Sequence, residues 1–385
     1  MALRGMAGCV RILLHDVKTK GPICANATKH SDCWTCRVGA KRHLLSEDII
    51  RLHEFQKRKL AVAHQMYGGK EEYFQTFNQK LQRNELILKD ELKLLLHLCQ
   101  TSDDMVTAKS AICRYHEENR NVAFGEFKFG PLFMRLCYEL GLEELAADAV
   151  KDKNLKGFFS DSTSFNIVMD MLFMKGYYNS ALEVLMDMRN QGVTVNKDAF
   201  IMAFGICYKL NTPKSYQICT TLLEEAQSKG HHVPRQAFCF VVALALKQND
   251  IERAKSVYAQ IMNTDSPICQ NLKVLMLATS GAMDDVLSIL TSAVMPNSPM
   301  FVKKPAFSQE VGEVLLLRTE DRPLLQTQVE RALANLKLTG QLTTLSLDDM
   351  LCRTPSGKRR PVGLLEQRTS SRRTFRPLQS TLVSE

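Results

Sequence analysis

Apolar positions between residues 162 and 196 recur with the spacing of two successive α-helices. In the first half they lie three and four residues apart, which places them on one helix face: Phe165, Val168, Met169, Leu172 and Phe173. Gly176 interrupts this pattern, and Gly192 ends a second apolar stretch formed by Ala181, Leu182, Leu185, Met186 and Met188. The segment therefore predicts a hairpin of two helices, with the small Ala181 where they cross closely.

The pattern recurs in the neighbouring segments, which together predict consecutive units of about 35 residues at 127–161, 162–196, 197–234 and 235–269. Gly141 and Ala146 repeat the offset of Gly176 and Ala181. Weaker helical pairs flank these units, one inside a helical N-terminal region at 47–126 and one at 270–294. Because a single hairpin cannot bury its apolar face, the units are expected to stack into an all-α solenoid. A generic helical bundle is the alternative, and the regular period argues against it.

The best unit resembles the pentatricopeptide repeat, on the residues Phe165, Asn166, Gly176, Ala181, Met188 and Gly192. A tetratricopeptide unit is less similar, because its early Trp and Leu-Gly positions are absent. The resemblance implies a right-handed α-solenoid whose first helices line a concave surface. It also implies binding of single-stranded RNA there, with one base read per repeat by two or three side chains.

Asn166 and Asn196 occupy the two positions that the family uses for base reading, and in family terms two asparagines imply a pyrimidine. Both amides can donate and accept hydrogen bonds. The alternative is structural: Asn166 forms a local hydrogen bond at the helix start and Asn196 caps the next helix. The corresponding pairs in the other units are Pro131 with Asp161, Ile201 with Pro234, and Cys239 with Cys269. These offer little hydrogen bonding to base edges, so shape, stacking and backbone contacts are expected to matter as much as base identity.

The net charge of +9 is concentrated at the two ends of the chain. Residues 1–46 hold eight Lys and Arg against two Asp, and residues 353–385 hold eight Lys and Arg against two Glu, so each end carries +6. The segment 47–352 is left with −3. Attraction to nucleic acid is therefore not a bulk property of the repeats, because it depends on local patches.

Residues 1–46 are poor in acids and amphipathic at their start, which fits a mitochondrial transit peptide and a matrix location. An ordinary disordered basic tail is the alternative. Cys33 and Cys36 form a lone C-x-x-C, and no second pair follows to complete a structural zinc site. We therefore expect neither a metal nor a cofactor. The scattered cysteines indicate a reducing compartment.

Prolines mark residues 295–307 as a linker, and the apolar pattern then predicts a helical cap at 308–352. Residues 353–385 are basic and nearly devoid of apolar clusters, so they are expected to form a disordered tail. Its candidate contacts to RNA phosphates are Arg359, Arg360, Arg372 and Arg373. A tail that only keeps the protein soluble is an equal alternative.

Catalytic signatures are missing: there is no phosphate-binding loop, no deaminase motif and no converging set of carboxylates. The chain also lacks an apolar run long enough to span a membrane. We expect a non-catalytic RNA-binding factor for mitochondrial RNA processing, maturation or stability, which would support respiratory-chain function indirectly. Other RNA-processing or ribosomal proteins are possible partners. The alternatives are a protein-binding scaffold and a structural subunit of a mitochondrial ribosome or RNA-processing complex.

Overall fold

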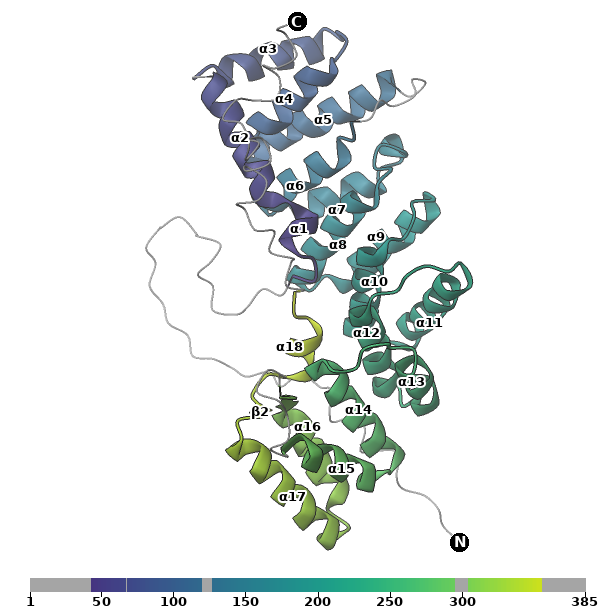
Figure 1. The fold of residues 1–385 in the computed structure, drawn as a ribbon. Coiled ribbons are helices and arrows are strands. Elements are labelled where there is room, and N and C mark those ends of the chain that lie inside the picture. The colour runs from purple at the N-terminus through teal and green to yellow at the C-terminus, as the bar shows by residue number, and fades with distance from the viewer. Residues whose placement is uncertain (1–42, 67, 120–126, 295–303, 355–385) are drawn as a thin grey trace, which may run out of the picture.

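The computed structural model describes residues 43–66, 68–119, 127–294 and 304–354 as an elongated stack of helix hairpins (Figure 1). The N-terminal part comprises α1 (Glu47–Ile50), α2 (Leu52–Met66), α3 (Lys70–Gln82), α4 (Lys89–Leu98) and α5 (Ser102–Glu118). The central hairpins are α6 (Gly130–Leu140) with α7 (Glu143–Lys151), α8 (Ser162–Lys175) with α9 (Tyr178–Asn190), α10 (Lys197–Leu210) with α11 (Pro213–Ser228), and α12 (Arg235–Lys247) with α13 (Ile251–Tyr258). A short 3-10 turn, η2 (Lys153–Leu155), follows α7.

One of these hairpins lies within each of the ranges 127–161, 162–196, 197–234 and 235–269. The all-α repeat fold expected from the sequence is confirmed. The small residues expected where paired helices cross, Ala146 and Ala181, are fully buried, and so is Ala254 in the fourth hairpin. Gly176 follows α8 with φ of 83°, in the left-handed region that glycine enters without steric cost, so the chain can reverse into α9.

The third unit is longer than the second because its second helix is longer. α9 has 13 residues and α11 has 16, whereas the turns before them are equally short. Thr212 caps α11 by accepting a hydrogen bond from the Ser215 N–H, and Pro213 occupies its first turn. The extra length of this unit therefore lies in the helix and not in the turn.

The solenoid ends in a hairpin of α14 (Pro267–Ser280) and α15 (Met283–Val294), followed by a cap. α14 begins at Pro267, so the last residues of the fourth predicted unit already belong to it. The cap contains β1 (Phe307–Ser308), α16 (Gln309–Thr319), α17 (Pro323–Leu338), β2 (Leu342–Thr343) and α18 (Leu347–Leu351), with β1 and β2 paired in parallel. Its apolar side chains form a second core with α14 and α15, separate from the long core of the repeats. Among the described residues, no helix combines the length and apolar character that a membrane crossing requires.

First and second helices of the repeats differ in burial. Every residue from Ser164 to Phe173 in α8 and from Asp198 to Tyr208 in α10 is buried, whereas α9 and α11 keep an exposed polar face. A helix that is apolar on all sides must be covered on all sides. The second helices cover one side of α8, α10 and α12, so other parts of the chain must cover the opposite side.

Candidate nucleic-acid interface

The structure brings the two predicted base-reading residues together. Asn166 lies in the second turn of α8, and Asn196 is the residue that caps α10. The Asn166 Nδ2 donates a hydrogen bond to the Asn196 Oδ1 over 3.1 Å. We call Asn166 and Asn196 the reading pair. The structural alternative is realised for Asn196, because its Oδ1 also accepts from the Ala199 N–H at 2.8 Å.

These contacts fix the orientation of both amides. Because the Asn196 side chain accepts a backbone N–H, the atom facing Ala199 must be its oxygen, and Asn166 must direct its amino group toward that oxygen. The Asn166 Oδ1 then faces away, is buried, and has no hydrogen-bond partner among the described residues. A buried acceptor without a partner costs about 1–3 kcal/mol, so native proteins rarely keep one without a reason.

The same face of α8 is covered by the chain's own N-terminal cover segment, residues 43–50. Asp170 lies one turn beyond Asn166, and both side chains are fully buried. The Asp170 Oδ1 accepts hydrogen bonds from the backbone N–H groups of Leu44 at 3.0 Å and Leu45 at 3.3 Å. Its Oδ2 lies 3.2 Å from the His43 Nδ1 and accepts from the Tyr138 hydroxyl at 3.3 Å. The segment is thus tied to α8 next to the reading pair.

A C-terminal cover segment, residues 344–354 including α18, lies over α12 and α14. The Lys209 Nζ contacts the Asp348 Oδ2 at 2.7 Å, and the Gln236 Nε2 donates to the carbonyls of Leu351 and Arg353. The Thr354 hydroxyl donates to the His43 carbonyl at 2.6 Å, so the two cover segments meet. In Figure 1, α1 and α18 lie on the side of the stack opposite α9, α11 and α13. The concave side is therefore closed over α8 to α12 by the chain itself.

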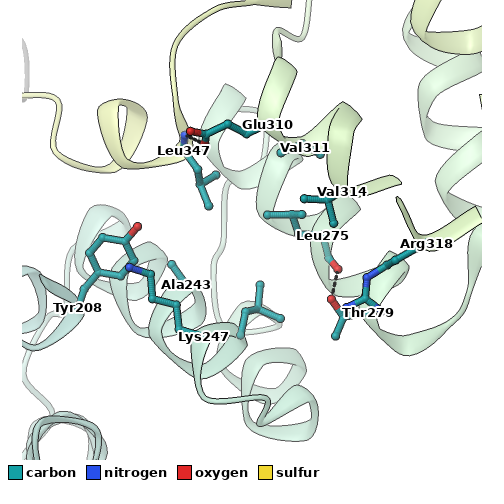
Figure 2. Close-up of a pocket in the computed structure, with 11 residues that line it drawn as sticks. Tyr208, Ala243, Lys247, Leu275, Thr279, Glu310, Val311, Val314, Arg318 and Leu347 are labelled. Atoms are coloured by element: carbon teal, nitrogen blue, oxygen red, sulfur yellow. Dashed lines mark hydrogen bonds between the residues drawn. The ribbon is translucent and has the colours of Figure 1, made fainter. Parts of the chain in front are cut away.

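The C-terminal cover segment leaves a hollow with a free volume of about 680 Å³ between the repeats and the cap (Figure 2). Its walls are mostly apolar, with Leu275, Val311 and Val314 facing Leu347. The Lys247 Nζ lies 3.8 Å from the centre of the Tyr208 ring. The concave side beneath the C-terminal cover segment thus resembles the apolar interior of a protein more than an exposed binding surface.

The other predicted base-reading positions are closed in part. Ile201, Cys239 and Cys269 are buried, whereas Pro131, Asp161 and Pro234 are half-exposed. The Cys239 and Cys269 sulfurs lie 3.6 Å apart, and the two residues have the same separation of 30 positions as the reading pair. Their hydrogen bond lowers the pKa of the Cys269 thiol, whereas the same contact and burial raise the pKa of Cys239. This unit therefore presents no amide or hydroxyl to a base.

Two groups of predicted residues lie outside the described part of the chain: Arg359, Arg360, Arg372 and Arg373 in the tail, and the Cys33–Cys36 motif. Conversely, sequence reasoning missed the cluster of His43, Tyr138 and Asp170. The available signal was Asp170 itself, a single carboxylate within an otherwise apolar helix. A buried charge in such a helix needs partners, which the cover segment supplies.

Comparison with known proteins agrees with the repeat pattern. A family model described as "Pentatricopeptide repeat-containing protein" matches residues 134–261. The chain is 52% identical over its full length to the full length of pentatricopeptide repeat-containing protein 2, mitochondrial, of Danio rerio. It is 50% identical to the human protein of that name, over 91% of this chain and 90% of the human one.

Among solved structures, the crystal structure of the pentatricopeptide repeat protein PPR10 from maize matches 68% of this chain and 39% of its own, with 17% sequence identity and a TM-score of 0.34. The extent and level of identity to the full-length relatives decide the assignment. This chain belongs to the pentatricopeptide repeat family.

Proposed function

We propose that this protein binds single-stranded RNA in the mitochondrial matrix and supports the processing, maturation or stability of mitochondrial transcripts, and through them the respiratory chain. Pentatricopeptide repeat proteins are generally RNA-binding and non-catalytic, and the relatives of this chain are named as mitochondrial proteins. The proposed role is therefore binding of RNA without catalysis by this chain.

The observation that carries the proposal is the unpartnered Oδ1 of Asn166. It belongs to the residue at the family's base-reading position, and Asn196 fixes its direction. An exocyclic amino group or ring N–H of a base is the kind of donor that would satisfy this oxygen. Base reading would thus remove a cost that the free protein carries.

Access to Asn166 requires the N-terminal cover segment to move. Its hydrogen bonds to Asp170 hold it one turn away from the reading pair. RNA binding at this position is therefore coupled to the release of residues 43–45 from Asp170, and a ligand shifts such an equilibrium only by its preference for the open state. The measured affinity equals the intrinsic affinity multiplied by the fraction of protein that is open.

The test is ultraviolet crosslinking in isolated mitochondria, followed by recovery and sequencing of RNA bound to the tagged full chain. Wild type is compared with Asn166→Ala and with Asn190→Ala, an exposed asparagine at the end of α9. We expect Asn166→Ala to change the selected sequences and Asn190→Ala to leave them unchanged. Failure to recover RNA with wild type would exclude RNA binding, and co-sedimentation with ribosomal subunits would then favour a structural role.

A further inference from the structure

A groove beside the N-terminal cover segment remains open. We call it the N-terminal groove; its free volume is about 1240 Å³. It lies between α1 and α2 on one side and α6 on the other, and it reaches the first turns of α8 and α10 through Thr163 and Asp198. Thr163 precedes Asn166 by one turn, and Asp198 follows Asn196 by two residues. The groove therefore leads to the reading pair.

Cations outnumber carboxylates along the groove. Five basic residues line it, Arg51, Arg58, Lys93, Lys128 and Arg135, against three acids, Asp48, Glu54 and Asp198. Within the described residues, only Arg58 has an ion pair, with Glu54 at 2.6 Å. This local surplus of positive charge contrasts with the net charge of −3 on residues 47–352 as a whole. Such a local patch attracts phosphate even when the domain is not basic.

Arg51 is the charged group with the largest effect on Arg135, ahead of the opposing carboxylates of Asp161 and Glu54. Arg51 ends α1 with φ of 54°, and the Arg135 Nε donates to the carbonyl of the adjacent Ile50. Burial lowers the pKa of Arg135, and the nearby Arg51 charge lowers it further. An anion between the two side chains would relieve this repulsion and accept their remaining N–H groups.

An aromatic platform adjoins these cations. Phe127 lines both the groove and a second hollow, of about 460 Å³, that contains Tyr115, Phe129 and Phe158. The Phe127 ring is half-exposed and lies edge-on to Phe129, with ring centres 4.8 Å apart. Lys93 and Lys89 lie 5.0 and 5.6 Å from its centre. An aromatic face between lysines is suited to a stacked base next to a phosphate.

We propose that the N-terminal groove binds a segment of single-stranded RNA that flanks the base at the reading pair, with phosphates at Arg51, Arg135 and Lys128 and an unpaired base stacked on Phe127. The identity of the ligand rests on the proposed function; of the base-reading positions of the repeats, Pro131 alone lines the groove. Cations spread along an elongated groove match a phosphate backbone better than a single small anion. An RNA duplex does not expose base faces for Phe127.

The experiment measures binding of the purified full chain to a fluorescent single-stranded RNA over a range of KCl concentrations. The double variant Arg51→Gln, Lys128→Gln removes two cations from the groove, and its matched control is Lys153→Gln, Lys214→Gln, which removes two exposed cations elsewhere. Each lost phosphate contact reduces the salt slope by about 0.7 for a single strand. We expect a slope lower by about 1.4 and at least tenfold weaker binding in the groove variant, and no change in the control.

The variant Phe127→Leu tests stacking separately. It should weaken single-stranded RNA binding about five- to hundredfold without changing the salt slope, and leave binding of a duplex of equal length unchanged. Thermal unfolding of each variant establishes that the fold is retained. If wild type binds RNA but the groove variants behave like the control, the groove inference is wrong and the proposed function stands. If wild type binds no RNA at all, the proposed function fails first.

Discussion

The two halves of the concave side are closed by the same chain in different ways. Over α8, the N-terminal cover segment is held by hydrogen bonds to one buried carboxylate and leaves a cationic groove open beside it. Over α12 and α14, the C-terminal cover segment is held by apolar packing and a partly exposed ion pair, and the hollow beneath it is mostly apolar. One half of the inner face therefore keeps an open groove with a surplus of cations, and the other half is filled mainly by apolar side chains.

Loss of Asp170 should produce the largest effect, because it removes the acceptor that fixes the N-terminal cover segment. Asp170→Ala leaves the Leu44 and Leu45 N–H groups without that acceptor and should lower the free energy of unfolding by about 3–5 kcal/mol. Urea denaturation of the full chain measures this value, with the exposed Asp148→Ala on α7 as control. A loss below about 1 kcal/mol would mean that this carboxylate does not anchor the segment.

A double-mutant cycle between Gly205 and Leu44 would sharpen the comparison, because it measures the coupling free energy between the N-terminal cover segment and α10. A Cβ at Gly205 would lie 2.7 Å from the Leu44 Cδ1. Gly205→Ala should therefore destabilise the wild-type protein, because its Cβ would clash with Leu44. In the Leu44→Ala variant this clash is absent, and the same substitution should stabilise the protein by about 1 kcal/mol through the higher helix propensity of alanine. The expected coupling is about 1–3 kcal/mol in chemical denaturation. Additive effects would show that the two residues do not touch in solution.

Asn166→Leu should cost little stability, although the residue is fully buried. The substitution loses a hydrogen bond to Asn196, but it also removes the unpartnered oxygen, so we expect unfolding free energy to stay level or rise by about 1 kcal/mol. RNA selection should change at the same time. Calorimetric unfolding of the RNA-free protein provides the measurement. A loss of more than about 2 kcal/mol would assign Asn166 a structural role instead.

The smallest effect is expected at the ion pair of the C-terminal cover segment. Lys209 and Asp348 keep 22% and 34% of their side-chain surface exposed, so Lys209→Met should cost less than about 1 kcal/mol. The loss should shrink further in high salt, because exposed charges are screened. Comparing denaturation at low and high KCl checks this. A salt-independent loss several times larger would show that charge, and not apolar packing, holds this segment.

The repeat fold was predictable because its signals are local. The spacing of Gly176 and Ala181, and its recurrence in the neighbouring unit, specify a helix hairpin and a close crossing without any knowledge of distant residues. The start of α11 has a local signal too, because Thr212 is a helix-capping residue and Pro213 suits the first helical turn.

The cover segments were not predictable, because they depend on contacts between residues far apart in the chain. Leu44 and Asp170 are 126 residues apart, and nothing in the local pattern pairs them. One signal was present: the continuous apolar run in α10 is too wide for a helix with an exposed face. The sequence places Asn166 and Asn196 at matching points of the repeat. It does not show that Asn166 is buried, because that burial depends on contacts with residues far away in the chain.

The hydrogen bond from Thr354 to His43 joins residues 311 positions apart. Ordinary repeat arrays rely on neighbour contacts, so they can grow outward from any unit and fray one unit at a time. Here the two segments that flank the described helices in sequence meet over the middle of the array, which adds contacts of very long sequence separation and should slow the last stage of folding. The repeats of this chain should consequently melt together, as one cooperative unit, and not peel away from either end.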